Sequence, residues 1–176
     1  MSAGRGDPMI TLTTERLILR IHTVADLDAC AVLWGDPEVV KFVGKQVLTR
    51  EQAWARLQRY VGHWHLYGYG FVAVVDRVTG AYVGEVGMAN FERDITPPVS
   101  AFETGWVLSP AAQGRGLASE ALRAVLGWTD VTFPNQTTTC IINVDHVVSL
   151  RVADKAGYRE RIRTTYHDAP CVLLDR

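Results

Sequence analysis

The amino-acid sequence predicts one mixed α/β domain. Short apolar runs that alternate or are rich in β-branched residues predict strands, and longer runs with apolar residues three and four apart predict helices. Glycine, proline or a capping residue stands at the ends of both kinds of run. In chain order the elements read β-α-α-β-β-β-α-β-α-β-β. A chain of 176 residues with no repeat or linker suits one domain. We expect it to span residues 10–176, after a loose N-terminal tail at residues 1–9.

The first half of the chain predicts a strand, two helices and a hairpin. Residues 14–21 alternate as a strand. Thr23 and Asp26 mark the start of a helix that Gly35 ends, and Thr49 with Gln52 forms a capping box before a longer helix. Apolar runs at 71–76 and 82–89 flank a turn at 79–80 and predict the hairpin. The buried stripe of the longer helix is expected at Trp54, Leu57, Val61 and Trp64.

A strand, a glycine-rich loop and a helix dominate the second half. The strand begins near Phe102 and stops before Pro110, because the proline ring removes a donor from the strand ladder. The helix that starts near Leu117 has apolar residues on one face. Residues 137–143 then predict a strand, 147–156 a helix, and 158–164 with 171–174 a closing pair of strands.

Composition excludes several classes of protein. Apolar residues make up 48% and charged residues 21%, which is ordinary for a globular domain. The formal net charge of −1 and the lack of a Lys/Arg run argue against a nucleic-acid partner. No apolar run approaches membrane-spanning length and no signal-peptide core follows the N-terminus, so we expect a cytoplasmic protein. Three widely spaced cysteines, Cys30, Cys140 and Cys171, indicate reduced thiols. The sequence leaves monomer and homodimer open.

The loop before the helix is suited to hold an anion. It reads Gln113-Gly-Arg-Gly-Leu-Ala118. The first amides of a helix lack internal acceptors and carry partial positive charge, and glycines let a phosphate approach them. The loop lacks the third glycine of the dinucleotide fingerprint and the Gly-Lys-Ser/Thr of the nucleoside-triphosphatase loop. An ordinary strand-to-helix turn is the alternative.

This segment resembles the GNAT acetyltransferase superfamily, whose pyrophosphate loop reads Arg/Gln-x-x-Gly-x-Gly/Ala. Gln113, Gly116 and Ala118 occupy those positions. A second segment is similar to the downstream Asn-x-x-Ser and Lys-x-Gly-Phe/Tyr pattern, at Ser149, Lys155, Gly157 and Tyr158. It departs in one place, because the usual Asn falls on His146. That departure puts one contact to the pantetheine arm in doubt, although a ring nitrogen could serve instead.

A third match points to one branch of the superfamily. Glu103-Thr-Gly-Trp106 resembles the Glu-x-Gly-Tyr/Trp strand of the ribosomal-protein N-terminal (alanine/serine) acetyltransferases. The resemblance runs from about Leu12 to Tyr158. It implies the GNAT-type acyl-CoA N-acyltransferase fold, an α/β (α+β) arrangement with a mixed, mostly antiparallel central sheet flanked by helices.

The resemblance also implies the reaction. The protein is expected to move the acetyl group of acetyl-CoA, a co-substrate, to a primary amine by direct attack in a ternary complex, without a metal. The acceptor is a protein N-terminal amine, another peptide amine or a small-molecule amine. Such chemistry needs positioning, a route for the amine proton and donors for the developing oxyanion.

The site residues follow from the matched motifs. Glu103 is the candidate base, with a structural salt bridge as its alternative, and Ser149 is the candidate acid toward the leaving thiolate, with a capping hydroxyl as its alternative. His146 could likewise be a helix cap that touches only solvent. The expected cofactor-binding residues are Trp106, Val107, Leu108, Gln113, Gly114, Arg115, Gly116, Leu117, Ala118, His146 and Ser149.

Other patterns carry weaker hypotheses. His63-Trp64-His65 suggests a metal site, but two histidines two residues apart on a helix point to different faces. One of them is instead expected at the acceptor groove. The aromatic residues Trp34, Tyr67, Tyr69 and Phe91 lie in the segments that line the acceptor site in the family, so they are expected to shape a pocket, with core packing as the alternative for Trp34. Two rival functions remain at this stage: a non-catalytic acyl-CoA-binding regulatory domain, and a regulatory domain that binds another nucleotide at 113–118.

Overall fold

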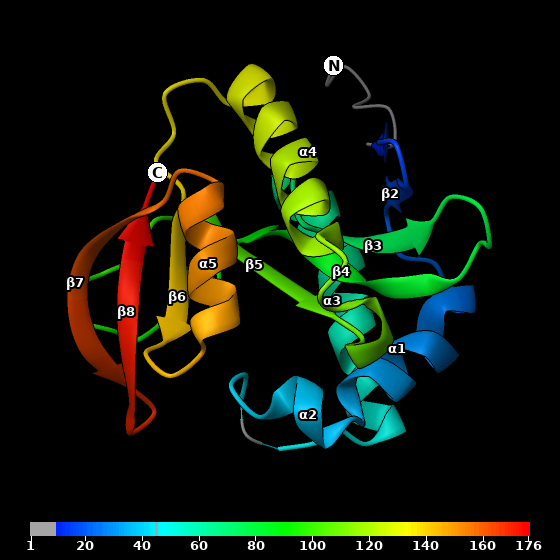
Figure 1. Ribbon diagram of the computed structural model, residues 1–176, viewed down its shortest axis with the longest axis horizontal. Helices are drawn as coiled ribbons and strands as arrows, with labels where there is room; N and C mark the ends of the chain where they lie inside the picture. Colours follow the sequence, from blue (N-terminus) through cyan, green and yellow to red (C-terminus); the bar gives the residue numbers. More distant parts are fainter. Residues whose placement is uncertain (1–9, 45) are drawn as a thin grey trace, which may run out of the picture.

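The computed structural model describes residues 10–44 and 46–176, so the tail expected at 1–9 lies outside the described residues. An eight-stranded sheet crosses the molecule in the order β1-β2-β3-β4-β5-β6-β8-β7 (Figure 1). All neighbouring strands are antiparallel except β5 and β6, as the mostly antiparallel prediction requires. The strands are β1 (Thr11–Thr13), β2 (Leu17–Arg20), β3 (Phe71–Asp76), β4 (Tyr82–Ala89), β5 (Glu103–Leu108), β6 (Thr139–Asn143), β7 (Arg159–Tyr166) and β8 (Ala169–Asp175).

The two parallel strands separate soon after they meet. Their register contains a single pair, Glu103 with Thr139. Beyond that pair β5 and β6 diverge, and the sheet opens between a larger part with β1–β5 and a smaller part with β6, β8 and β7 (Figure 1). The carboxyl end of β5 therefore faces an opening instead of a neighbouring strand.

Helices cover both faces of the larger part. One face packs against α4 (Leu117–Thr132), whereas α1 (Leu27–Trp34) and α3 (Arg50–Tyr67) cover the other. α5 (Val147–Lys155) lies against β6, and the short α2 (Pro37–Val40) lies near the open end of the gap (Figure 1). Single 3-10 turns, Val24–Asp26 and Pro110–Ala112, precede α1 and the glycine loop.

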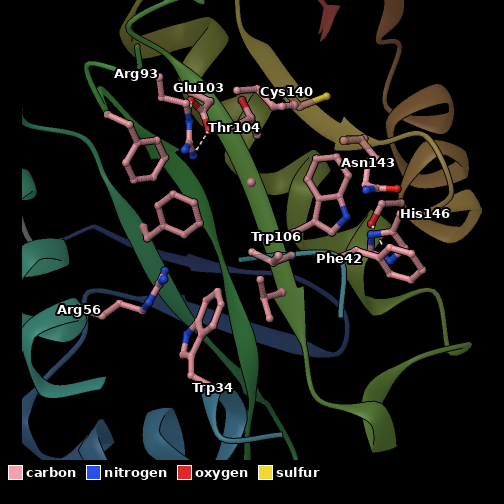
Figure 2. Close-up of a pocket in the computed structure, with 18 of the residues that line it drawn as sticks. Trp34, Phe42, Arg56, Arg93, Glu103, Thr104, Trp106, Cys140, Asn143 and His146 are labelled. Atoms are coloured by element: carbon pink, nitrogen blue, oxygen red, sulfur yellow. Dashed lines mark hydrogen bonds and ion pairs between the residues drawn. The ribbon is translucent and has the colours of Figure 1, made fainter. Parts of the chain in front are cut away.

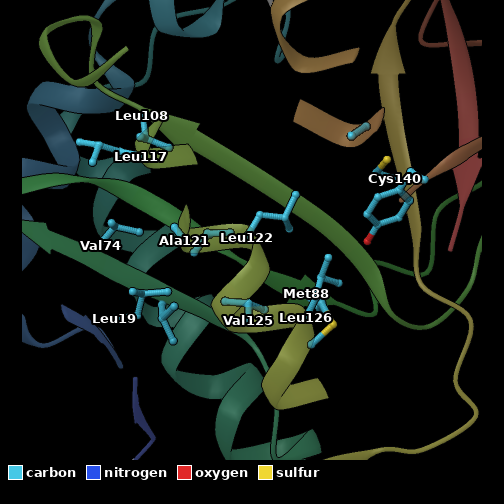
Figure 3. Close-up of a cluster of buried hydrophobic side chains, with 14 of the residues drawn as sticks. Leu19, Val74, Met88, Leu108, Leu117, Ala121, Leu122, Val125, Leu126 and Cys140 are labelled. Atoms are coloured by element: carbon cyan, nitrogen blue, oxygen red, sulfur yellow. The ribbon is translucent and has the colours of Figure 1, made fainter. Parts of the chain in front are cut away.

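The main core lies between α4 and the sheet (Figure 3). Leu117, Ala121, Leu122 and Val125 on α4 are at most 4% exposed, at the three- and four-residue spacing of one helix face. They meet alternate strand residues such as Leu19, Val74 and Met88. At about 25 cal/mol per Å² of buried apolar surface, this is the contact that fixes α4, and with it the glycine loop, against β5.

Two local expectations were correct only in part. In α3 Leu57 and Trp64 are buried as predicted, but Ala53 and Tyr60 complete the buried face, whereas Val61 is 39% exposed and Trp54 is only half-buried. The true spacing is four, three, four, and the sequence favoured Trp54 and Val61 because they looked like core residues. The predicted first strand at 14–21 is confined to Leu17–Arg20, because a turn around Thr14 separates it from the additional strand β1.

Candidate active site

A cavity opens on the α1/α3 side of β5, just where β5 leaves β6. Its lining is rich in aromatic side chains and also includes the charged groups of Arg56, Arg93 and Glu103, a combination suited to a ligand pocket. Figure 2 shows the side chains reaching into it from α1, α3, the loop after β4, β5 and β6. Gly105 has no side chain to fill this space, and an added Cβ would lie 3.0 Å from the Phe71 ring. We call this the inner cavity; it is lined chiefly by Trp34, Arg56, Tyr60, Phe71, Phe91, Arg93, Glu103, Gly105 and Trp106.

A second hollow continues from the inner cavity to the glycine loop. It runs between β5 and α5 and ends at Gln113 and Ala118, at the start of α4. We call it the groove. The two hollows share six lining residues: Phe42, Val43, Trp106, Val107, His146 and Ser149. A long ligand could therefore lie along the groove with one end at the loop and the other in the inner cavity.

The glycine loop has the backbone that an anion site needs. Gly114 and Gly116 adopt left-handed φ values of 73° and 78°, which favour glycine, and nothing lies within 4 Å of a Cβ added at Gly114. Gly116 is the N-cap of α4, so the first helical amides point toward this open space. The loop is held from behind, because Arg16 donates to the Arg115 carbonyl at 2.9 Å and to the Glu120 carboxylate at 2.7 Å. The residues present thus fit a pyrophosphate.

The remaining predicted loop residues differ in exposure and in the groups that they could present to a ligand. Leu117 is 1% exposed and its side chain is in the core, so only its backbone faces the loop. Arg115 is exposed, with its guanidinium 4.0 Å from Asp76. The Gln113 side chain donates to the Leu108 carbonyl at 3.3 Å, which ties the loop to the end of β5.

Glu103 lies at the start of β5 and is paired with Arg93. The guanidinium donates through Nε and Nη2 to the two carboxylate oxygens, at 2.5 and 2.6 Å, and Arg93 also donates to the Tyr166 hydroxyl at 3.1 Å. Glu103 is 5% exposed. Burial raises the pKa of this carboxyl and the charge of Arg93 opposes that, with a net shift upward. Glu103 therefore forms the salt bridge that the sequence left as its alternative role. Its carboxylate also borders the inner cavity.

His146 and Ser149 lie opposite β5, at the start of α5. His146 is the N-cap of α5, yet its side chain makes no capping hydrogen bond. Its ring instead stacks on Phe42, with 4.4 Å between ring centroids, and Nε2 lies 3.3 Å from the Ser149 hydroxyl. Burial lowers the pKa of His146, which favours the neutral ring. Both side chains border both hollows.

Known proteins resemble this chain in sequence and in structure. The family model for the acetyltransferase (GNAT) domain matches residues 16–159. The chain belongs to the GNAT family. A Bordetella pertussis protein assigned to this family has a solved structure that is 32% identical, covers 95% of this chain and 99% of that one, and superposes with a TM-score of 0.85. The uncharacterized N-acetyltransferase YnaD of Bacillus subtilis is 28% identical over 84% of this chain and 82% of its own.

Solved ribosomal-protein acetyltransferases share the GNAT fold with this chain. RimL, a ribosomal L7/L12 alpha-N-protein acetyltransferase solved in complex with coenzyme A, superposes with a TM-score of 0.77 over 95% of this chain and 97% of that one, at 15% identity. The resemblance predicted from the sequence is thus confirmed at the level of family and fold. Within residues 10–44 and 46–176, every helix is too short or too polar to traverse a bilayer.

Several polar residues in and behind the inner cavity were not predicted from the sequence. Arg56 and Arg93 both enter the inner cavity (Figure 2). Behind its wall, Glu85 on β4 is completely buried and accepts hydrogen bonds from Trp34 Nε1 at 3.0 Å and from the hydroxyls of Tyr82, at 3.1 Å, and Tyr60. The available signal was a lone carboxylate in an otherwise apolar strand, since a buried charge needs partners. The arginines gave no such signal, because arginine is common on exposed helix faces and loops.

Of the histidine and aromatic residues singled out in the sequence, some line the inner cavity and others lie in the core or at the surface. His63 is buried, with Nδ1 2.7 Å from the Tyr69 carbonyl and Nε2 2.9 Å from the Asn90 amide, so both ring nitrogens are used. Its side chain borders a small hollow next to the inner cavity. Trp34 and Phe91 line the inner cavity, whereas Tyr69 packs in the main core and Tyr67 is 43% exposed.

Proposed function

We propose that this protein transfers the acetyl group of acetyl-CoA to a primary amine by direct attack within a ternary complex. One observation carries the proposal: the groove from the glycine loop and the inner cavity meet at Trp106 and Val107 on β5. This arrangement suits a long acyl donor that enters along one hollow and an amine that enters through the other. The coenzyme A in the RimL structure supports the same ligand class here.

Different segments of the chain are suited to bind different parts of acetyl-CoA. The loop amides from Gln113 to Ala118 are proposed to hold the pyrophosphate, and the residues shared by the two hollows the pantetheine arm. Backbone groups of Trp106 to Leu108 are proposed to orient the thioester, because β5 pairs there only with β4 and its edge toward β6 is left open. When bound, acetyl-CoA supplies an already activated acyl group, so the protein needs to provide position more than covalent chemistry.

Proton transfer is assigned to groups on opposite walls. We assign Glu103 as the base that takes the amine proton, directly or through water, since its pKa is raised and it borders the inner cavity. Ser149 is assigned as the donor to the departing thiolate, with His146 3.3 Å away to hold its hydroxyl. His146 is the proposed substitute for the family's Asn contact.

The cysteines support direct attack over a route through an acetylated thiol. All three are buried, and burial raises the pKa of each thiol, to about 12 for Cys30. Because the thiolate is the reactive form, buried thiols with raised pKa values are poor nucleophiles at neutral pH. Only Cys140 lines the inner cavity.

The direct test is release of free CoA thiol from acetyl-CoA with a panel of amino acids, peptides, polyamines and drug-like amines. We expect thiol release that depends on the amine and a ternary, sequential kinetic pattern. Tight CoA binding without thiol release for any amine would instead favour the non-catalytic regulatory domain. Stabilisation by ATP or NAD but not by CoA, in a thermal-shift comparison, would favour the other nucleotide-binding reading.

A further inference from the structure

The inner cavity contains a cation that no carboxylate of the described chain neutralises directly. Arg56 lies on α3 with its guanidinium carbon 3.6 Å from the centroid of the Trp34 ring (Figure 2). Nη1 donates to the Tyr60 hydroxyl at 3.0 Å. Nε is buried and has no hydrogen-bond acceptor among the residues that the structure describes. A guanidinium offers five N–H donors in a planar fork, so most of this fork is unused.

The carboxylates around the cavity have other partners. Glu103 accepts hydrogen bonds from two of the three guanidinium nitrogens of Arg93, Nε and Nη2. Glu85 accepts from three donors, has His22 Nε2 at 3.7 Å, and is reached by Arg56 only through the Tyr60 hydroxyl. Counting two arginines and these two glutamates, the charges around the cavity balance, but Arg56 is the charge that still has free donors.

A second arginine extends the positive region toward the surface. Arg59, one turn along α3, lies 5.7 Å from the Phe91 ring centroid and has neither an ion pair nor a side-chain hydrogen bond within the described chain. Desolvation lowers the pKa of Arg59, and the neighbouring charges of Arg56 and Arg93 lower it further. A guanidinium held on an aromatic face with free donors is well formed for a planar anion.

We propose that Arg56 anchors a carboxylate carried by the acceptor amine, with Arg59 drawing such molecules to the cavity. The acceptor class is therefore an amine that also bears a carboxylate: a free amino acid, or a peptide with an acidic residue close to its N-terminus. The carboxylate binds the fork of Arg56 while the amine reaches β5 near Glu103. This inference rests on the proposed function, because it names the substrate of the same site.

Matched acceptors separate charge from shape. Phenylalanine is compared with phenylalaninamide, and Ala-Asp-Ala-amide with Ala-Asn-Ala-amide, by release of CoA thiol. Amidation of phenylalanine also makes its α-amine less basic, so kcat/KM is expressed per neutral amine. In either pair the anionic member is then expected to have a kcat/KM higher by about 10- to 100-fold, the range for charge-assisted hydrogen bonds in a partly desolvated site. The pair with the larger preference identifies the free amino acid or the peptide as the source of the carboxylate.

Variants assign the preference to Arg56. In Arg56→Gln the ratio within each pair is expected to approach one, mainly through KM, and Arg56→Lys is expected to keep part of the ratio, because it retains the charge without the fork. Arg163→Gln is the control, since Arg163 lies on β7 and pairs at the surface with Glu160. Thermal melting checks that each variant is folded, and if Arg56→Gln is not, Arg56→Lys and wild type decide. An equal rate for both members in wild type, or an equal loss for both in the Arg56 variants, would overturn the inference.

A binding measurement distinguishes this inference from the proposed function. If neither these four compounds nor the wider panel of amines releases thiol, the proposed function fails, and the four compounds are titrated calorimetrically into the protein with CoA. Tighter binding of the anionic members that is lost in Arg56→Gln would still support the anion site. Equal or no binding of all four would overturn it together with the acetyl transfer.

Discussion

The Glu103 carboxylate accepts two hydrogen bonds from the Arg93 guanidinium, at 2.6 and 2.5 Å, at the edge of β5 that borders the inner cavity. Arg93 belongs to the loop between β4 and β5, so the pair ties that loop to the start of β5. The arrangement keeps the carboxylate oriented and charged while burial makes it more basic than an exposed glutamate.

The first prediction concerns this pair. Glu103→Gln is expected to lower kcat by about a hundredfold to ten-thousandfold, because the shape remains and the base is lost. A base works deprotonated, so wild-type kcat rises with pH through the raised pKa of Glu103. Arg93→Gln is expected to move that rise to higher pH, because the charge that favours the carboxylate is gone. A pH profile of kcat for the three proteins is the measurement, and near-normal turnover of Glu103→Gln would leave the residue a purely structural role.

The second prediction concerns the start of α4. Gly116→Val is a poor probe, because the left-handed backbone at φ 78° would strain a β-branched residue and disturb the fold as well as the site. Ala118→Leu avoids this, since Ala118 is helical and borders the groove. We expect it to weaken CoA binding roughly tenfold or more by filling the path of the ligand. Ala111→Leu, on an exposed turn outside both hollows, is the control, and equal CoA affinity in the two variants would contradict the loop assignment.

The third prediction concerns His146. Its pKa is lowered by burial, and a ligand in the groove would bury the ring further. CoA affinity should therefore fall modestly as the pH drops through this lowered pKa, because only the neutral ring is favoured in the complex. His146→Asn should remove the pH dependence and keep or improve binding. Calorimetric titration of CoA at several pH values tests this, and identical profiles for both proteins would mean that the departure from the family pattern is silent.

The fourth prediction concerns stability. Asp26 is 5% exposed; burial alone would raise its pKa, but hydrogen bonds from Arg20, at 2.7 and 2.8 Å, and from the Thr23 amide lower it overall. A lowered pKa means stabilisation that is full above the unfolded value of about 3.9 and lost as the pH falls through the folded one. Asp26→Asn should therefore reduce the free energy of unfolding by about 1–3 kcal/mol at pH 7, with a smaller difference below pH ~4.

Urea unfolding at pH 7 and at low pH measures the effect of Asp26→Asn. Asp28→Asn is the matched control, because Asp28 pairs with Arg50 while its side chain is 83% exposed, and exposed ion pairs stabilise little. A loss of equal size in the two variants would show that the buried ion pair has no special weight.

Sequence reasoning reached the family and the loop because both depend on local patterns. Gln113 to Ala118 needs only the end of a strand, two glycines and the start of a helix, all visible within a dozen residues. The Glu103–Arg93 pair could be named only as an unspecified salt bridge, since its geometry depends on how the β4–β5 loop folds back. Arg56 could not be predicted as a site residue for the same reason. Its position depends on the Trp34 ring against which it packs, 22 residues earlier in the chain, and on the cavity that it lines.

The face of α3 illustrates a different limit. Spacing alone allowed two apolar stripes that share Leu57 and Trp64, and the large side chain of Trp54 favoured the wrong one. The surface against which α3 packs decides which face is buried. Tyr60 is buried because its hydroxyl donates a hydrogen bond to Glu85 on β4, a strand that is separated from α3 in the chain by β3. Polar pairing between distant elements thus overrides a local hydrophobic count.

The single register pair between β5 and β6 has a consequence for the ligand-free protein. Few backbone hydrogen bonds join the two parts of the sheet, so a ligand lying between the strands would act as a surrogate strand and complete the ladder. Amide hydrogen exchange should then slow along the facing edges of β5 and β6 when CoA is added. The melting temperature should rise as well, since a ligand at a hundred times its Kd adds about 2.7 kcal/mol to the folded state. The proposed acyl donor would in this way also join the two parts of the sheet.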